Sequence, residues 1–125
     1  MKILLDTHAL LWWLFDDPRL PDKARGLIID HENAVFFSVA SIWEISIKKA
    51  LGKLHLPEEF YSALSDSGFQ KLVIDIEHAQ IIETLPLHHH DPFDRMLIAQ
   101  VVCENMKLLS KDSKLASYDI DIIWH

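Results

Sequence analysis

Three histidines and two aspartates gather within residues 88–94, HHHDPFD, directly before an apolar stretch with the spacing of a helix. Asp91 and Pro92 have a structural explanation, because an N-cap aspartate accepts a helix amide and proline at the next position lacks only an amide that would stay unpaired. Asp94 then becomes the third residue of the helix, where a carboxylate also interacts favourably with the helix dipole. The apolar residues 96–99 predict that this helix start faces the interior, so Asp94 is a candidate functional group as well as a capping one.

Four other acids stand at or near the ends of apolar runs. Asp6 and Asp75 directly follow such a run, and Asp112 comes two residues after another. Glu44 lies in the second turn of a helix pattern that itself follows an apolar run. Each signal is weak alone, because Asp6 or its neighbour Thr7 could cap a helix and Asp112 could be an ordinary turn residue.

Glu44 has two structural alternatives. Ser41 and Glu44 have the spacing of a capping box, although Ser38 is better placed as the N-cap because it directly follows the strand pattern. Glu44 and Lys48 also form an i,i+4 pair in the favourable orientation. The apolar neighbours of Glu44 argue against a fully exposed position, so a functional role stays open beside the ion pair.

The elements that must position these acids have the pattern of an α/β fold. Short apolar runs, nearly continuous as in strands covered on both faces, alternate with longer helical spacings. We expect strands at residues 2–5, 34–38, 71–74, 107–110 and 120–124, and helices near residues 8–15, 22–31, 39–50, 57–66, 77–84 and 93–105. This alternation predicts a mostly parallel five-stranded sheet with helices on both faces, in a single domain over residues 1–125.

In such folds the functional groups gather beyond the carboxyl ends of the strands, so the acids are expected along one edge of the sheet. Two carboxylates about 4 Å apart repel each other by roughly 4 kcal/mol at an effective dielectric constant near 20. A fold that brings several of them together therefore needs a cation. Oxygen ligands without a cysteine favour a hard ion, Mg²⁺ or Mn²⁺.

The three histidines suggest a competing site for zinc or another transition metal. Consecutive residues of an extended segment point to alternating sides, so His88, His89 and His90 seldom bind one ion together. A solvated loop is the ordinary expectation for these residues, and contact with a phosphate is the functional alternative.

Composition limits the classes of protein to which the chain can belong. The chain has 125 residues, half of them apolar and a quarter charged, which is typical of a folded globular domain. A formal charge of −7 argues against nucleic-acid binding by Lys and Arg alone, unless bound cations supply positive charge where a phosphate would lie. The single cysteine, Cys103, excludes an internal disulfide and falls in an apolar helix pattern, which predicts a buried, inert thiol.

No apolar run approaches the roughly 18 residues of a membrane span. The N-terminal apolar run is interrupted by Asp6 and His8 and lacks the small-residue cleavage site of a secretory signal. We therefore expect a cytoplasmic protein with no membrane partner.

Four stretches of the chain together resemble the PIN-domain ribonucleases, and among them the VapC-type toxins of bacterial toxin–antitoxin systems. These stretches are ILLDTHALLWWL (3–14), SVASIWEISIKKALGKL (38–54), HHHDPFDRMLIAQ (88–100) and LLSKD (108–112). No stretch is decisive alone, but four in this order and at fitting intervals are specific, and they span nearly the whole chain. His90 departs from the pattern, because many relatives have a basic residue at that position.

The resemblance implies a PIN-like three-layer α/β/α fold and metal-dependent cleavage of single-stranded or looped RNA. It implies four catalytic and metal-binding acids that hold Mg²⁺, or Mn²⁺, and activate a water: Asp6, Glu44, Asp94 and Asp112. Ser110 would support them, whereas Asp75 has no part and Asp91 remains ambiguous. The residues expected to bind the substrate are basic and close in sequence to the acids: Lys48, Lys49, Lys53, Arg95, Lys111 and Lys114.

The same resemblance implies two protein partners, a small antitoxin whose C-terminal segment covers the site and a second copy of the chain in a homodimer. Residues 9–15, ALLWWLF, have too many large apolar side chains for a one-sided helix. Most of these side chains are expected in the core, and the remainder could form a subunit interface or a groove for a partner.

Two other functions also fit an acid cluster at a sheet edge. A receiver-type or phosphatase-type domain would use an aspartate as a phosphoryl acceptor beside Mg²⁺. A PIN-like fold could also serve only as a binding module. The complete set of four acids argues against the pure binding module, whereas the receiver or phosphatase alternative depends on whether an aspartate becomes phosphorylated.

Overall fold

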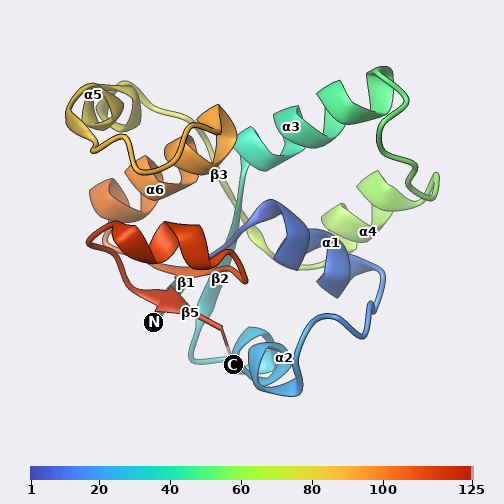
Figure 1. The fold of residues 1–125 in the computed structure, drawn as a ribbon. Coiled ribbons are helices and arrows are strands. Elements are labelled where there is room, and N and C mark those ends of the chain that lie inside the picture. Colours follow the sequence, from blue (N-terminus) through green and yellow to red (C-terminus); the bar gives the residue numbers. More distant parts are fainter. Residues whose placement is uncertain (125) are drawn as a thin grey trace.

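Five strands form the centre of the protein in the computed structural model, which describes residues 1–124 (Figure 1). In their order across the sheet they are β3 (Gln70–Leu72), β2 (Ala34–Ser38), β1 (Lys2–Leu5), β4 (Lys107–Leu109) and β5 (Ile122–Ile123). Every neighbouring pair is parallel. The predicted parallel five-stranded sheet is therefore confirmed.

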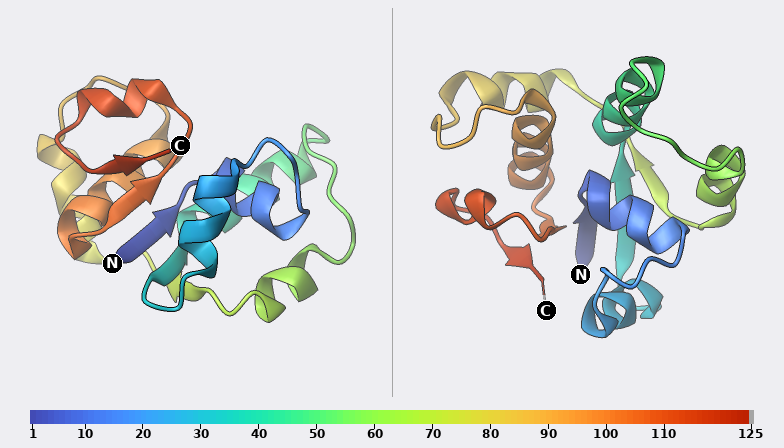
Figure 2. Two further views of the ribbon diagram at one scale, coloured as in Figure 1. Left: turned by 90° about the horizontal axis from the view of Figure 1, so that it is seen from below. Right: turned by 45° about the vertical axis from the view of Figure 1, so that its right-hand side comes forward.

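Helices cover both faces of this sheet and give the predicted three layers (Figure 2). They are α1 (Thr7–Leu14), α2 (Asp22–Ile29), α3 (Val39–Ala50), α4 (Phe60–Asp66), α5 (Ile76–Thr84) and α6 (Pro92–Glu104), followed by a short 3₁₀ helix, η1 (Ser113–Ser117). Parallel strands need such crossovers, because a tight hairpin cannot return the chain in the same direction. Within residues 1–124, none of these helices is both long and apolar enough to cross a membrane.

The core lies on the two faces of the central strands. Successive residues of β1 point to opposite faces, as the pleat requires. Ile3 and Leu5 pack with residues of α1 and α2, whereas Leu4 packs with residues of α6, β4 and η1. All three side chains are fully buried, so β1 is covered on both sides, as its continuous apolar pattern predicts.

The outer strands are shorter than expected. The sequence predicts that β3 continues through Val73 and Ile74, but both side chains are exposed and the strand ends at Leu72. Within residues 1–124 the only neighbour of β3 is β2, whose last residue, Ser38, pairs with Leu72. In the part of the chain that the structure describes, no strand pairs with β3 beyond Leu72, and β5 consists of the two residues that pair with β4.

Two local expectations are wrong. Helix α4 begins at Phe60 instead of residue 57, because Pro57–Glu59 lie in a turn before it. Cys103 is exposed instead of buried. The buried part of α6 covers residues 97–101 and Cys103 falls in the last turn, beyond the part that packs on the sheet.

Helix starts place three of the candidate acids. Ser38 caps α3, since its hydroxyl accepts from the Ala40 amide, as predicted. Asp91 caps α6, since its carboxylate accepts from the Asp94 amide at 2.9 Å. Asp6 caps α1, so its neighbour Thr7 belongs to the helix and is not the cap. Capping therefore fixes the backbone from which Asp6, Glu44 and Asp94 project.

Replacing Ser38 with Ala is expected to destabilise the fold by about 1–3 kcal/mol, because it removes an N-cap and leaves a buried amide without its partner. The Ser38 hydroxyl lies 2.6 Å from Oε1 of the fully buried Gln100 and donates to it. Denaturant unfolding measures the loss. Ser46→Ala, on an exposed position of the same helix, is the control and should change the unfolding free energy by less than about 0.5 kcal/mol. Equal effects of the two substitutions would contradict this account.

Candidate metal centre

The pairing of β1 with β4 brings the first and last sequence motifs together. Leu5 pairs with Leu109, so the next residues, Asp6 and Ser110, meet where the strands end. The Asp6 amide donates to the Leu109 carbonyl at 3.1 Å, and the Ser110 hydroxyl donates to Asp6 Oδ2 at 2.6 Å. These two side chains are 104 positions apart in the sequence. Ser110 thus holds the Asp6 carboxylate by a hydrogen bond.

Asp6 is a buried carboxylate with both oxygens oriented. Only 7% of the residue is exposed. Oδ1 accepts from the Ala9 amide at 2.8 Å and Oδ2 accepts from Ser110. Burial raises the pKa of Asp6 above its ordinary value, and the hydrogen bonds from Ser110 and Ala9 partly counter that effect. Each carboxylate oxygen can accept further contacts, so Asp6 keeps the capacity to bind a cation.

Glu44 points from α3 into the same region and is buried. Thr7 Oγ1 donates to Glu44 Oε1 at 2.8 Å, and Lys48 Nζ donates to Oε2 at 2.7 Å. The predicted Glu44–Lys48 ion pair is therefore present. The hydrogen bond to Glu44 raises the pKa of Lys48, and the charges of Asp91 and Asp94 act in the same direction.

Asp94 lies in the first turn of α6. Burial raises the pKa of Asp94, and the negative charges of Asp91 and Glu44 raise it further. Asp94 in turn raises the pKa of Asp6 through its charge. These acids thus act on one another electrostatically, which is the condition that calls for a cation.

His89 is the group that sequence reasoning left undecided. Its Nε2 lies 2.8 Å from Asp94 Oδ2 and 3.9 Å from Asp112 Oδ2. The side chain is 16% exposed, whereas His88 and His90 are exposed. The alternation of side chains along an extended segment already implied that the middle histidine points away from its neighbours. What the sequence could not supply was the side on which the acids lie.

The three side chains His89, Asp94 and Asp112 form a group that can hold a metal ion. One nitrogen and two oxygen atoms, one from each residue, all lie within 4.8 Å of one another. Asp112 caps η1, since its Oδ1 accepts from the Lys114 amide, and its own amide donates to the Ser110 hydroxyl. The donor set suits a divalent cation, and the desolvated carboxylates around it gain from one.

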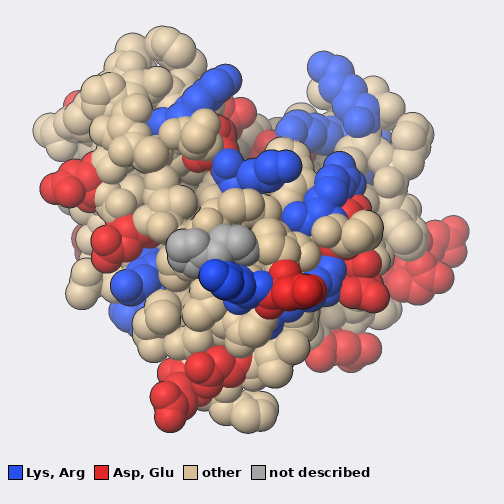
Figure 3. Space-filling model, turned by 60° about the horizontal axis from the view of Figure 1, so that its bottom comes forward, with Lys and Arg blue, Asp and Glu red and all other residues tan. Residues whose placement is uncertain are grey.

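Basic and apolar side chains surround this edge of the sheet. A pocket of about 420 Å³ is lined by residues of α1, the loop after it and the segment after β4: Asp6, His8, Trp12, Arg19, Lys111, Asp112 and Ser113. A neighbouring pocket of about 620 Å³ extends from α1 to residues 54–57. On the face seen in Figure 3, Lys and Arg side chains gather around a hollow. Arg19 and Lys111 line the first pocket together with Asp6 and Asp112, so basic side chains lie beside the candidate metal centre although the net charge of the chain is negative.

Not every predicted substrate-binding residue faces this pocket. Arg95 directs its guanidinium to the backbone carbonyls of Ile82, Leu85, Pro86 and His89, and so holds the loop before α6. Lys48 is paired with Glu44, and Lys49 lies over the Tyr61 ring. Lys53 and Lys114 are exposed, and Lys111 lines the pocket that contains Asp6 and Asp112.

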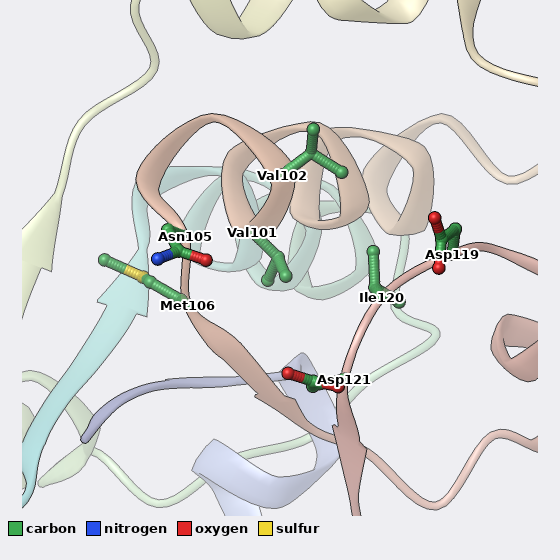
Figure 4. Close-up of a pocket in the computed structure, with 7 residues that line it drawn as sticks. All are labelled: Val101, Val102, Asn105, Met106, Asp119, Ile120 and Asp121. Carbon is green, nitrogen blue, oxygen red and sulfur yellow. The ribbon is translucent and has the colours of Figure 1, made fainter.

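Asp75 and one further pocket lie away from the four candidate acids. Asp75 starts α5 after the edge strand β3, where its amide donates to His78 Nδ1. A further pocket of about 270 Å³ lies between the end of α6 and residues 119–121 (Figure 4). Met106, which directly precedes β4, lines this pocket, so the pocket lies at the amino end of that strand, opposite the acids.

Asp94→Asn is expected to raise the unfolding midpoint of the metal-free chain at neutral pH. A raised folded-state pKa means that the ionised carboxylate destabilises the fold, and this cost grows as the pH rises from the unfolded-state pKa through the higher folded-state value. Below the unfolded-state pKa the two proteins should be equally stable. Thermal unfolding in a chelator at several pH values measures the difference.

The same comparison in Mg²⁺ should reverse the order. At a Mg²⁺ concentration about 100 times the dissociation constant, binding adds about 2.7 kcal/mol to the wild type and far less to the variant. An Asp94→Asn protein that Mg²⁺ stabilises as much as the wild type would exclude Asp94 as a ligand. Asp66→Asn, on the exposed end of α4, is the matched control and should follow the wild type in both conditions.

Comparison with known proteins agrees with the geometry. The PIN domain family model matches residues 3–121. The chain is 24% identical over 119 residues to Ribonuclease VapC22 of Mycobacterium tuberculosis, and the match covers 93% of this chain and 91% of that protein. VapBC2 of Rickettsia felis, solved with a DNA fragment from its promoter, superposes with a TM-score of 0.76 at 15% identity over 100% of both chains. VapBC-5 of M. tuberculosis, a member of the VapBC family of toxin–antitoxin systems, superposes with a TM-score of 0.65 at 14% identity over 99% of this chain and 98% of that one.

The family model spans almost the whole described chain, from β1 to the residue directly before β5. It therefore covers every acid that the sheet edge brings together. The expectation drawn from the four sequence stretches is confirmed, and this chain belongs to the PIN-domain family.

Proposed function

We propose that this protein is a metal-dependent endoribonuclease that cleaves single-stranded or looped RNA and acts as the toxin of a toxin–antitoxin pair. The observation that carries the proposal is the convergence of buried and half-buried carboxylates at one sheet edge in a PIN-domain chain. The names of the similar proteins, a VapC ribonuclease and VapBC complexes, support it. The family match also favours this activity over the receiver or phosphatase alternative.

We assign the metal to Asp6, Asp94 and Asp112, with Glu44 beside them, and Mg²⁺ is the ion expected of oxygen ligands. Bound there, Mg²⁺ would lower the pKa of a water and stabilise charge on the cleaved phosphodiester. Glu44 is the candidate that orients that water, because Thr7 and Lys48 hold its two oxygens in fixed positions. Ser110 fixes Asp6, which keeps the buried carboxylate in the rotamer that faces the site.

The substrate would approach over the pocket that joins α1 to the segment after β4. Lys111 is the basic residue of the proposed set that lines this pocket with Asp6 and Asp112. Arg19 lines it as well, and both cations lie over the Trp12 ring, at 5.0 Å for Arg19 and 6.0 Å for Lys111. Because the Arg19 guanidinium is paired with Asp17, Lys111 is the cation of the two that offers positive charge to a phosphate next to the one that is cleaved.

Besides the RNA substrate, a segment of an antitoxin is proposed to bind in this region. The neighbouring pocket is largely apolar in its side chains, with Leu11, Phe15, Leu54 and Leu56 among its lining residues. A short apolar peptide could cover it and block the acids at the same time. A homodimer, a single domain over residues 1–125 and a cytoplasmic location complete the proposal, in line with the family resemblance.

The direct test is RNA cleavage by purified protein with Mg²⁺, with a chelator, and with Asp94→Asn. We expect cleavage only by the wild type with Mg²⁺ or Mn²⁺, and a loss of at least about 100-fold in the variant, since even changes beside metal ligands cost 10–100-fold. Growth arrest on expression, absent for the variant, would support the toxin role. Undiminished cleavage by Asp94→Asn or in the chelator would overturn the assignment.

Ser110→Ala is expected to move the acidic limb of the cleavage pH profile to higher pH. The Ser110 hydrogen bond lowers the pKa of Asp6, so its removal raises that pKa further. A higher pH is then needed to ionise Asp6 for metal binding. The measurement is the cleavage rate against pH at one fixed Mg²⁺ concentration. Ser117→Ala, at the exposed end of η1, should leave the limb where it is, and an unmoved limb in Ser110→Ala would contradict the supporting role.

A further inference from the structure

We propose that His89 is itself a ligand of the metal ion that Asp94 and Asp112 hold, and that its nitrogen gives the site a preference for Mn²⁺ over Mg²⁺. The inference deepens the proposed function and rests on its metal site. It departs from an all-oxygen donor set in one atom, His89 Nε2.

The geometry around Nε2 fits a shared ion. In an octahedral site with ligands at about 2.0–2.1 Å, neighbouring ligand atoms are about 3.0 Å apart and opposite ones about 4.2 Å apart. His89 Nε2 lies 2.8 Å from Asp94 Oδ2 and 3.9 Å from Asp112 Oδ2. Both separations fall close to these values. A cation can therefore bind between the three atoms with only small side-chain shifts, in place of the present hydrogen bond.

The loop holds His89 in this position through its backbone. The His89 amide donates to the Tyr118 hydroxyl at 3.0 Å, and its carbonyl accepts from Arg95 Nη1 at 3.3 Å. Arg95 directly follows Asp94 in α6, so the same contact ties the histidine loop to the helix that carries the acid. The backbone that carries the ring is thus anchored, and the ring itself already contacts Asp94, so it loses little further conformational freedom on binding an ion.

The neighbouring histidines lack this placement. His88 is exposed and packs its ring edge-on against Tyr118 at 5.1 Å between ring centroids. His90 is exposed as well. In the group of His89, Asp94 and Asp112 the one histidine is therefore the middle member of the triplet, and His90 offers a matched control in the same loop.

The alternative is that His89 only orients Asp94 by a hydrogen bond and moves aside when a metal binds. The two roles differ in their chemistry. Imidazole nitrogen suits transition ions, whereas Mg²⁺ takes oxygen ligands and holds its waters. A nitrogen bound to Mn²⁺ is detectable in the electron paramagnetic resonance spectrum of the ion. A histidine that only forms a hydrogen bond to Asp94 is not a ligand of the ion.

The test uses the whole protein, freed of metal by chelation, with Mn²⁺ alone as the probe and no RNA present. Pulsed electron paramagnetic resonance should detect a histidine nitrogen coupled to bound Mn²⁺ in the wild type, with the expected change on ¹⁵N-histidine labelling. The coupling should vanish in His89→Gln and persist in His90→Gln. His89→Gln should also weaken Mn²⁺ binding by about 10-fold or more, with a smaller effect on Mg²⁺.

Three results would overturn the proposal: bound Mn²⁺ without nitrogen coupling in the wild type, coupling that survives in His89→Gln, or no Mn²⁺ binding at all. The second would direct attention to the separate group of His78, Cys103 and Glu104, whose donor atoms also lie within 4.8 Å of one another. Failure of the proposed function is distinguishable. A protein that couples His89 nitrogen to Mn²⁺ but cleaves no RNA would keep the ligand and lose the ribonuclease.

Discussion

The site depends on one constraint, the parallel pairing of β1 with its two neighbours. Parallel strands end at the same edge of a sheet, so the residues after one strand lie beside the residues after its neighbour. β1 lies between β2 and β4, which brings Asp6, Ser110 and the start of α3 to one place. The burial of β1 on both faces makes its register costly to shift, because a slip of one residue would exchange the side chains on the two faces.

The same arrangement places carboxylates in buried positions, where the protein by itself stabilises their negative charge poorly. The raised pKa values of Asp6 and Asp94 are a direct consequence of burial, and the neighbouring charges add to the effect at Asp94. Nearby protein groups offset part of this cost: Ser110 donates to Asp6, and Lys48 and Thr7 donate to Glu44. The remaining negative charge is available to a cation and through it to a phosphate. Function and stability are thus opposed at this edge, as is common where charged groups are gathered for chemistry.

The loop before α6 performs two tasks at once. Asp91 starts the helix and thereby orients Asp94, while Arg95 returns from the helix to hold the carbonyls of the loop. The sequence placed Arg95 among the substrate-binding residues, but its guanidinium donors bind backbone carbonyls of this loop. The loop carries His89 beside two acids because of this anchoring, and the proposal for a nitrogen ligand rests on that placement.

The sequence by itself determined the fold class, the order of the elements and the set of acids that could meet. The spacing of apolar residues and the length of an apolar run are local properties of the sequence. Apolar runs such as those of β1 and β2 therefore predict buried strands without knowledge of the strands that pair with them. Tertiary structure alone decided where β3 stops, since Val73 and Ile74 have strand-like sequences but no strand among the described residues pairs with them. It also decided that Cys103 is exposed, that Thr7 faces Glu44 and that His89 lies between Asp94 and Asp112. Each of these depends on which surface of a helix or loop meets a segment far away in the chain, and no local pattern contains that information.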